Sequence, residues 1–146
     1  MSLAELFDMR EVLELPAAAW AARNHDADRL AMVTAAYEAL QVASLEEVTD
    51  WRQLQELDAA FHMRIVEASG NRFLPRTLGV LQEMLAQSME TTLQVTGRLE
   101  KSRQDHKQIL DALLAGDAAA ARRAAAAHIR GARQAAFARL RNVRPE

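Results

Sequence analysis

The sequence predicts an all-α domain, an antiparallel bundle of about six helices, from three observations. Its 146 residues are enough for one domain with one sizeable core. Ala (30) and Leu (19) dominate while Gly (5), Pro (3) and Tyr (1) are scarce, so residues that favour helices outnumber those that favour strands and turns. The segments between the helix signals are short, and short connections make consecutive helices antiparallel neighbours.

Polar caps bound the first three expected helices. The first covers about 4–23 and contains Pro16, which predicts a kink. Asp26 is a good N-cap for a second helix that runs to about residue 43. The runs 44–47 and 50–53 both fit the capping-box pattern, and the third helix then continues to about residue 69.

Glycines end the next helices. Gly70, Gly97 and Gly116 suit positions just after the third, fourth and fifth helices. Pro75 is tolerated because it falls near the first turn of the fourth helix. The last three helices are therefore expected to run to about 95, from 98 to 115, and from about 118 to 142, with 143–146 as a tail.

Charge and composition exclude several function classes. The net charge of −2 and the pI of about 6.1 argue against a general nucleic-acid binder. The absence of Cys excludes disulfides, thiolate zinc sites and cysteine nucleophiles. No apolar run reaches 18 residues and no signal peptide is visible, so we expect a cytoplasmic protein without membrane contact.

An aspartate interrupts the apolar stripe of the third expected helix. Asp58 lies in the middle of this stripe and His62 lies one turn further, on its edge. A buried carboxylate is costly unless it is paired or bound to a metal. Residues at i and i+4 share a helix face, so one cation can contact both side chains. Alone, this pair fits a hydrogen-bonded core pair as well as a metal site.

Two more histidines lie on apolar faces, His106 on the fifth expected helix and His128 on the sixth. A single His on such a face is more often a satisfied core residue than a ligand. Three inward histidines and an inward Asp are best explained by one shared partner, and their ligand types suit a divalent transition metal. His25 stands in a polar turn, so we expect it to be exposed.

Other polar residues lie on inward faces of the first and fourth helices. Arg10 lies near the centre of an apolar stripe, so it either extends its guanidinium to water or pairs with an anion inside the bundle. Ser88 and Thr92 share a face with several leucines. Their hydroxyls suit either a ligand or the preceding turn of their own helix.

Short motifs follow one another along nearly the whole chain, and their order and spacing are more specific than any one of them. They are Arg10 with Leu13-Glu14 and Ala21-Ala22, the run Asp58-Ala59-Ala60-Phe61-His62, Ala68-Ser69-Gly70-Asn71, Asp105-His106 with Ile109-Leu110, Leu114 with Gly116-Asp117, and Ala121 with His128. In these residues the chain resembles the FCD domain, the C-terminal effector-binding domain of FadR-type regulators in the GntR family.

The resemblance implies a metal and effector cavity inside the bundle. Its metal ligands would be Asp58, His62, His106 and His128. Zn or Ni suits this set best, with Co, Fe and Mn as further candidates. Arg10 would hold a small carboxylate effector that also binds the metal, and we expect Ser88 and Thr92 to contact this small organic acid.

The resemblance also implies a domain organisation and partners. Residues 4–142 would form the effector-binding domain, and 1–3 a leader added ahead of it. Family members carry an N-terminal winged helix-turn-helix, for which this chain has no room, so we expect a piece of a longer regulator. DNA would then be a partner only through that missing domain. A homodimer is the default expectation.

Two other functions remain as alternatives to this non-enzymatic sensor. A helical-bundle metalloenzyme of the di-iron type needs Glu-x-x-His motifs, which are absent before all three inward histidines. A mononuclear hydrolase would need a general base, and Glu14 is the one candidate. A metal-free dimerisation module would use the inward polar residues as core hydrogen-bond partners.

Overall fold

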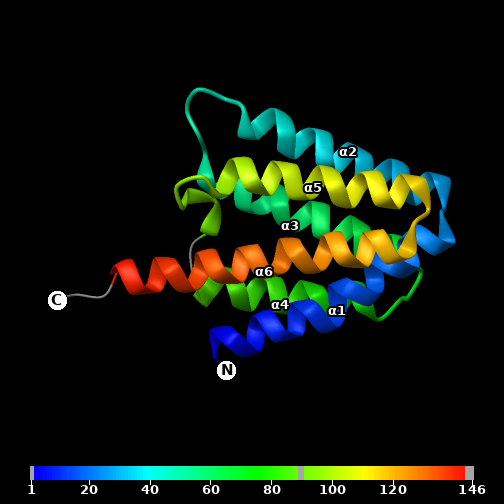
Figure 1. The fold of residues 1–146 in the computed structure, drawn as a ribbon, viewed down its shortest axis with the longest axis horizontal. Coiled ribbons are helices and arrows are strands. Elements are labelled where there is room, and N and C mark those ends of the chain that lie inside the picture. Colours follow the sequence, from blue (N-terminus) through cyan, green and yellow to red (C-terminus); the bar gives the residue numbers. More distant parts are fainter. Residues whose placement is uncertain (1, 89–90, 144–146) are drawn as a thin grey trace.

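The computed structural model describes residues 2–88 and 91–143, which form a bundle of six α-helices (Figure 1). The helices are α1 (Leu3–Asn24), α2 (Ala27–Ser44), α3 (Trp51–Ala68), α4 (Leu74–Ser88), α5 (Arg98–Ala115) and α6 (Ala118–Val143), and a short 3₁₀ helix, η1 (Thr92–Gln94), precedes α5. Consecutive helices run in opposite directions, as the colours of Figure 1 show. The predicted all-α bundle is confirmed.

The helices pack in a way that brings α3, α5 and α6 around one interior. Helix α1 packs against α6, α3 and α4, while α2 packs against α3 and α5, and α5 packs against α6. The largest apolar cluster surrounds Phe61 and joins α1, α2, α3, α5 and α6. Buried alanines on α1 and α6, such as Ala22 and Ala121, belong to this same cluster and let the two helices approach closely because a methyl group takes little space.

Most of the predicted helix ends agree with the structure. Asp26 and Asp50 cap α2 and α3, since their side chains accept hydrogen bonds from the backbone N–H groups of Arg29 and Gln53. Helix α1 continues through Pro16 as one element. Ser2 caps α1 in a reciprocal capping box with Glu5, so Ser2 and Leu3 of the expected leader contribute to the first turn of the domain.

Two local predictions are wrong. The described part of α4 reaches Ser88, residues 89–90 of the predicted helix lie outside the described residues, and η1 follows at Thr92–Gln94, so the helix does not extend to residue 95. β-Branched residues crowd this stretch, and the side chain of Thr91 caps η1. The expected capping box at 44–47 does not form. Ser44 is instead the last residue of α2, buried, and its hydroxyl donates to the carbonyl of Gln41 at 2.8 Å.

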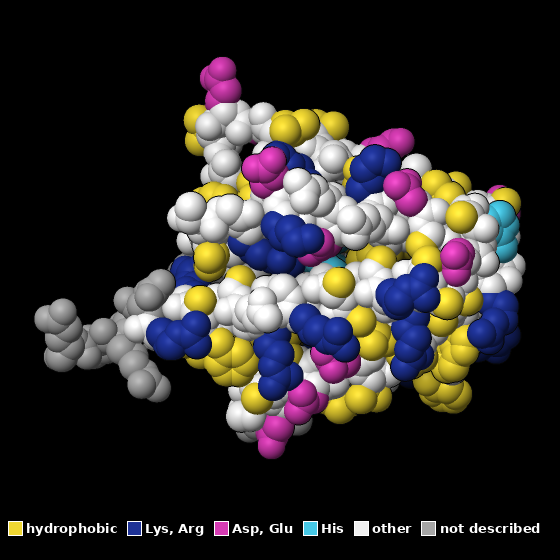
Figure 2. Space-filling view, viewed as in Figure 1, with side chains coloured by type: hydrophobic (Ala, Val, Ile, Leu, Met, Phe, Trp, Pro, Cys, Tyr) yellow, Lys and Arg dark blue, Asp and Glu magenta, His cyan; other side chains and the backbone are white. Residues whose placement is uncertain are grey.

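Arginines on α6 fasten this helix to its neighbours, and Figure 2 shows Lys and Arg side chains along it. Arg133 pairs with Asp8 of α1 at 2.7 Å. Arg139 donates to the carbonyl of Thr91 at 2.8 Å, which ties α6 to the segment before α5. None of the described helices is both long and apolar enough to cross a membrane.

Candidate metal centre

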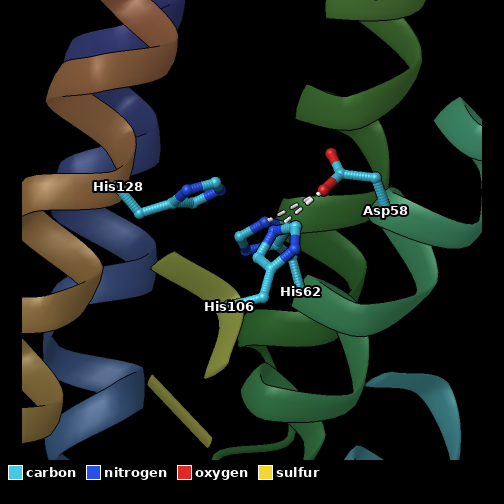
Figure 3. Close-up of side chains that lie close together, drawn as sticks. All are labelled: Asp58, His62, His106 and His128. Carbon is cyan, nitrogen blue, oxygen red and sulfur yellow. Dashed lines mark ion pairs between the residues drawn. The ribbon is translucent and has the colours of Figure 1, made fainter. Parts of the chain in front are cut away.

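Three helices bring together the four residues that the sequence analysis singled out as metal ligands (Figure 3). Helix α3 supplies Asp58 and His62, α5 supplies His106 and α6 supplies His128. One donor atom from each residue lies within 4.8 Å of the other three. Two ligands of one ion can lie about 4.4 Å apart, because each bond is about 2.0–2.2 Å long. The four donors are therefore close to the separation that a single ion requires.

Several of these donor atoms are buried without a hydrogen-bond partner. They are Asp58 Oδ1, His62 Nε2 and His106 Nε2, judged over the described part of the chain. His106 Nε2 lies 3.1 Å and His62 Nε2 3.6 Å from Asp58 Oδ1, so the three atoms face one another. Unpaired buried polar atoms are costly. The imidazole and carboxylate donors fit a divalent transition metal, which would satisfy all of them at once.

A buried glutamate supports His62 from α1. Glu14 is 4% exposed, and its Oε1 lies 2.7 Å from His62 Nδ1. The same carboxylate accepts from Arg10, with Oε2 2.7 Å from Nε and Oε1 3.3 Å from Nη2. In the sequence, Glu14 was singled out only as a possible general base. Its position four residues after Arg10, on the same helix face, was the signal for this pair.

A second buried network supports His128. Its Nδ1 lies 3.2 Å from Asp105 Oδ2 and 3.2 Å from Arg98 Nη2. Lys101 holds the other oxygen of Asp105 at 2.7 Å. Gly131 on α6 makes room for Arg98, because a Cβ there would lie 2.6 Å from Nη1. Arg98 was not predicted from the sequence, because no local pattern indicates that the first residue of a helix is buried.

In the metal-free protein the site raises the pKa of one histidine and lowers the pKa of the other two. Burial lowers the pKa of His62, but the carboxylates of Glu14 and Asp58 outweigh it and raise that pKa to about 9. Burial and the neighbouring His106 lower the pKa of His128 to about 3. Burial also lowers the pKa of His106, although Asp58 opposes this shift. One imidazole is therefore held protonated and two are held neutral.

These shifts predict that the metal-free protein is most stable near pH 6.5. His62 gains its proton more readily in the fold, so its contribution, about 3 kcal/mol, is complete below pH 6.5 and is lost as the pH rises through 9. His106 and His128 stay neutral in the fold while the unfolded chain takes up protons, so stability also falls below pH 6.5.

Urea unfolding of chelator-treated protein between pH 5 and 9 measures this profile. The His62→Gln variant should lose most of the alkaline decline and keep the acidic one. A wild-type protein whose stability rises steadily from pH 6.5 to 9 would contradict the assignment of a protonated His62.

A pocket of about 480 Å³ lies beside the cluster. Asp58 and His62 form part of its wall, and Arg10, Gln82 and Thr92 add further polar groups. Arg10 and Thr92, two of the three residues expected at the effector site, therefore line the same pocket. Ser88 lies outside this lining. Its hydroxyl donates to the carbonyl of Met84 at 2.7 Å, the contact within its own helix that the sequence analysis gave as the alternative.

His25 and a surface hollow lined by arginines are separate from the cluster. His25 is exposed, as expected, and ends α1 in the left-handed conformation with φ of 47°. Its Nε2 lies 2.9 Å from the carbonyl oxygen of Leu114, so it links α1 to the end of α5. The hollow near Arg29, Arg64 and Arg72 is open to the surface, and no histidine among the described residues lines it.

The fold and the site define the chain as an all-helical domain with a buried Asp–His cluster beside a pocket. The FCD domain family model matches residues 5–131. The chain therefore belongs to the FCD domain family, the regulatory domains of GntR-type transcriptional regulators, and is not an enzyme.

Curated relatives include two kinds of bacterial regulator. The chain is 25% identical over 130 residues to "HTH-type transcriptional regulator LutR" of Bacillus subtilis (strain 168), which covers 86% of this chain and 58% of that protein. It is 35% identical over 78 residues to "Putative L-lactate dehydrogenase operon regulatory protein" of Escherichia coli (strain K12), covering 51% of this chain and 30% of that protein. The chain thus spans little more than half of LutR.

A solved structure has the same fold. The structure called "Streptococcus agalactiae GntR" superposes with a TM-score of 0.74 over 89% of this chain and 57% of that chain. The two sequences are 22% identical in this comparison. At that identity the likeness concerns the arrangement of the helices.

Proposed function

We propose that this domain is a metal-dependent sensor of a small organic acid. Asp58, His62, His106 and His128 would hold a divalent transition metal, and the acid would bind in the adjoining pocket. One observation carries the proposal. Three donor atoms of this cluster are buried, face one another and lack hydrogen-bond partners among the described residues. A metal is the simplest partner that satisfies them together.

The donor set narrows the metal and its role. Imidazole nitrogens and a carboxylate oxygen suit Zn or Ni best, and Co, Fe and Mn remain compatible. When bound, such a metal would supply positive charge that favours an anionic ligand. The chain's own residues add a second cationic group, since Arg10 lines the pocket that Asp58 and His62 also line. A guanidinium matches the geometry of a carboxylate.

The pocket supports an acid that also carries hydroxyl groups. Thr92 and Gln82 offer neutral polar groups there, while Phe7 and Leu85 provide apolar wall. Such a mixture of a few polar groups in a partly apolar pocket is typical of small-molecule sites. We therefore propose a small hydroxy acid or polycarboxylic acid as the effector.

The parent protein would act on transcription in the cytoplasm, as a homodimer. We propose that it binds DNA through a winged helix-turn-helix outside this chain, in keeping with the regulators that the chain is similar to. Helix α1 would transmit the signal, because Arg10 contacts the pocket from this helix. The effector would act by binding more tightly to one of two arrangements of α1.

We predict that replacing Arg10 weakens acid binding. Metal-loaded Arg10→Ala should bind citrate, L-lactate or gluconate about 10–100-fold more weakly than the wild type, because a charge-assisted hydrogen bond to an anion is lost. Titration calorimetry of both proteins measures the change, and elemental analysis verifies that both carry the metal.

Arg123→Ala is the control, since Arg123 is an exposed residue of α6. It should bind the same acids as the wild type does. Equal affinities in wild type and Arg10→Ala would reject the role of Arg10. Wild-type protein that binds none of the three acids, with or without metal, would reject the sensor function.

A further inference from the structure

Glu14 is the one buried glutamate in the described part of the chain, and it joins two groups that the proposed function uses separately. Its carboxylate lies between Arg10, which lines the pocket, and His62, which belongs to the cluster. Both of its contacts on Arg10 Nε and His62 Nδ1 are 2.7 Å long. A buried charge is tolerated only when such partners compensate it.

The contact with His62 settles which ring nitrogen faces the cluster. Nδ1 carries the hydrogen that is donated to Glu14 Oε1. In the metal-free protein both ring nitrogens of His62 carry a hydrogen. A metal would displace the hydrogen of Nε2 and use its lone pair, while Nδ1 keeps the hydrogen that it donates to Glu14. Nε2 is the atom that is buried without a hydrogen-bond partner and faces Asp58. Glu14 therefore selects the tautomer that a metal requires.

The contact with Arg10 leaves one edge of the guanidinium available. Glu14 accepts from Nε and Nη2, which lie on the same edge of the planar group. The other edge, formed by Nη1 and the second N–H of Nη2, can still hold an anion in a two-point contact. The side chain of Arg10 is 12% exposed and belongs to the pocket wall. The pairing thus fixes a long, flexible side chain before any ligand arrives.

We propose that Glu14 is a shared positioning residue, which presents Nε2 of His62 to the metal and the free edge of Arg10 to the acid. The carboxylate of Glu14 contacts both Arg10 and His62. A substitution of Glu14 should therefore weaken both metal binding and acid binding, although Glu14 itself touches neither ligand. The inference rests on the proposed function and adds a residue that touches neither ligand. We therefore expect the ligand to carry a carboxylate, which would bind the Nη1–Nη2 edge of the Arg10 guanidinium that Glu14 holds in place.

Two substitutions separate the roles of Glu14. A Leu at this position removes every acceptor, so Nδ1 of His62 and the donors of Arg10 both lose their partner. A Gln keeps one acceptor oxygen for His62 Nδ1, but its NH₂ group would face a donor of Arg10. Glu14→Gln should therefore keep much of the contact that orients His62 and lose the contact that holds Arg10.

The experiment measures two affinities for wild type, Glu14→Leu, Glu14→Gln and the control Glu11→Gln, which changes a glutamate on the same helix. Zinc affinity, from competition with a chromophoric chelator, should fall about 10–100-fold in Glu14→Leu and clearly less in Glu14→Gln. Acid affinity of the zinc-loaded proteins, measured with citrate, L-lactate and gluconate, should fall about tenfold or more in both. Glu11→Gln should match the wild type.

The outcomes distinguish this inference from the proposed function. If wild type binds zinc and an acid and both Glu14 variants do the same with unchanged affinity, the Glu14 inference is wrong and the sensor function stands. If wild type binds no zinc, both are wrong. Should Glu14→Leu fail to fold, Glu14→Gln decides, because unchanged acid affinity in that variant would still refute the role in positioning Arg10.

Discussion

Removing the proposed metal should lower the melting temperature of the domain by about 8–16 °C. A ligand that binds only the folded state stabilises it by about 4 kcal/mol when its free concentration is 1,000 times the Kd. For a chain of this size, each kcal/mol corresponds to about 2–4 °C. The effect is large because chelation returns Asp58, His62 and His106 to a buried state with unsatisfied donor atoms.

A thermal melt with and without a chelator measures this shift, and added zinc should reverse it. His106→Ala should contain little metal by elemental analysis, and its melting temperature should not respond to the chelator. The matched control is His25→Ala, because His25 is exposed and lies at the end of α1, away from the cluster. Equal metal content in wild type and His106→Ala would show that the cluster is not the metal site.

Local signals account for most of the fold that the sequence could predict. Asp26, Asp50 and Gly116 have strong preferences for helix ends, and helices begin or end beside them. The end of α4 was missed because a Gly gives a clear stop signal, whereas the run of β-branched residues before Gly97 weakens a helix only gradually. The predicted end of this helix, near residue 95, therefore lay just before Gly97.

The cluster could be predicted because each member is anomalous on its own helix. Asp58 in an apolar stripe, and His106 and His128 on apolar faces, call for an explanation before their distance is known. The residues that contact the cluster from outside show no such anomaly in the sequence. Asp105 and Arg98 read as ordinary polar residues of a helix, and only the packing of α5 against α6 brings them to His128. Local periodicity carries no information about such contacts between helices.

Phe61, the aromatic residue that packs against the cluster, should contribute about as much to stability as the proposed metal would. Phe61 is fully buried, and its ring centroid lies 4.7 Å from that of His106 and 5.5 Å from that of His62. Phe61→Ala should lower the free energy of unfolding by about 3–5 kcal/mol, because it removes apolar contacts and leaves a cavity in the largest apolar cluster. Urea unfolding of the chelator-treated protein measures this loss without a contribution from the metal.

Phe73→Ala is the matched control, since the same change is made at a side chain that is 82% exposed. Its effect should stay within about 0.5 kcal/mol. Phe61→Leu should lose less stability than Phe61→Ala, because it keeps much of the buried volume. Zinc affinity should also fall in Phe61→Ala, because the rings of His62 and His106 lose the aromatic ring against which they pack. A Phe61→Ala protein as stable as Phe73→Ala would mean that this ring does not hold the core around the cluster.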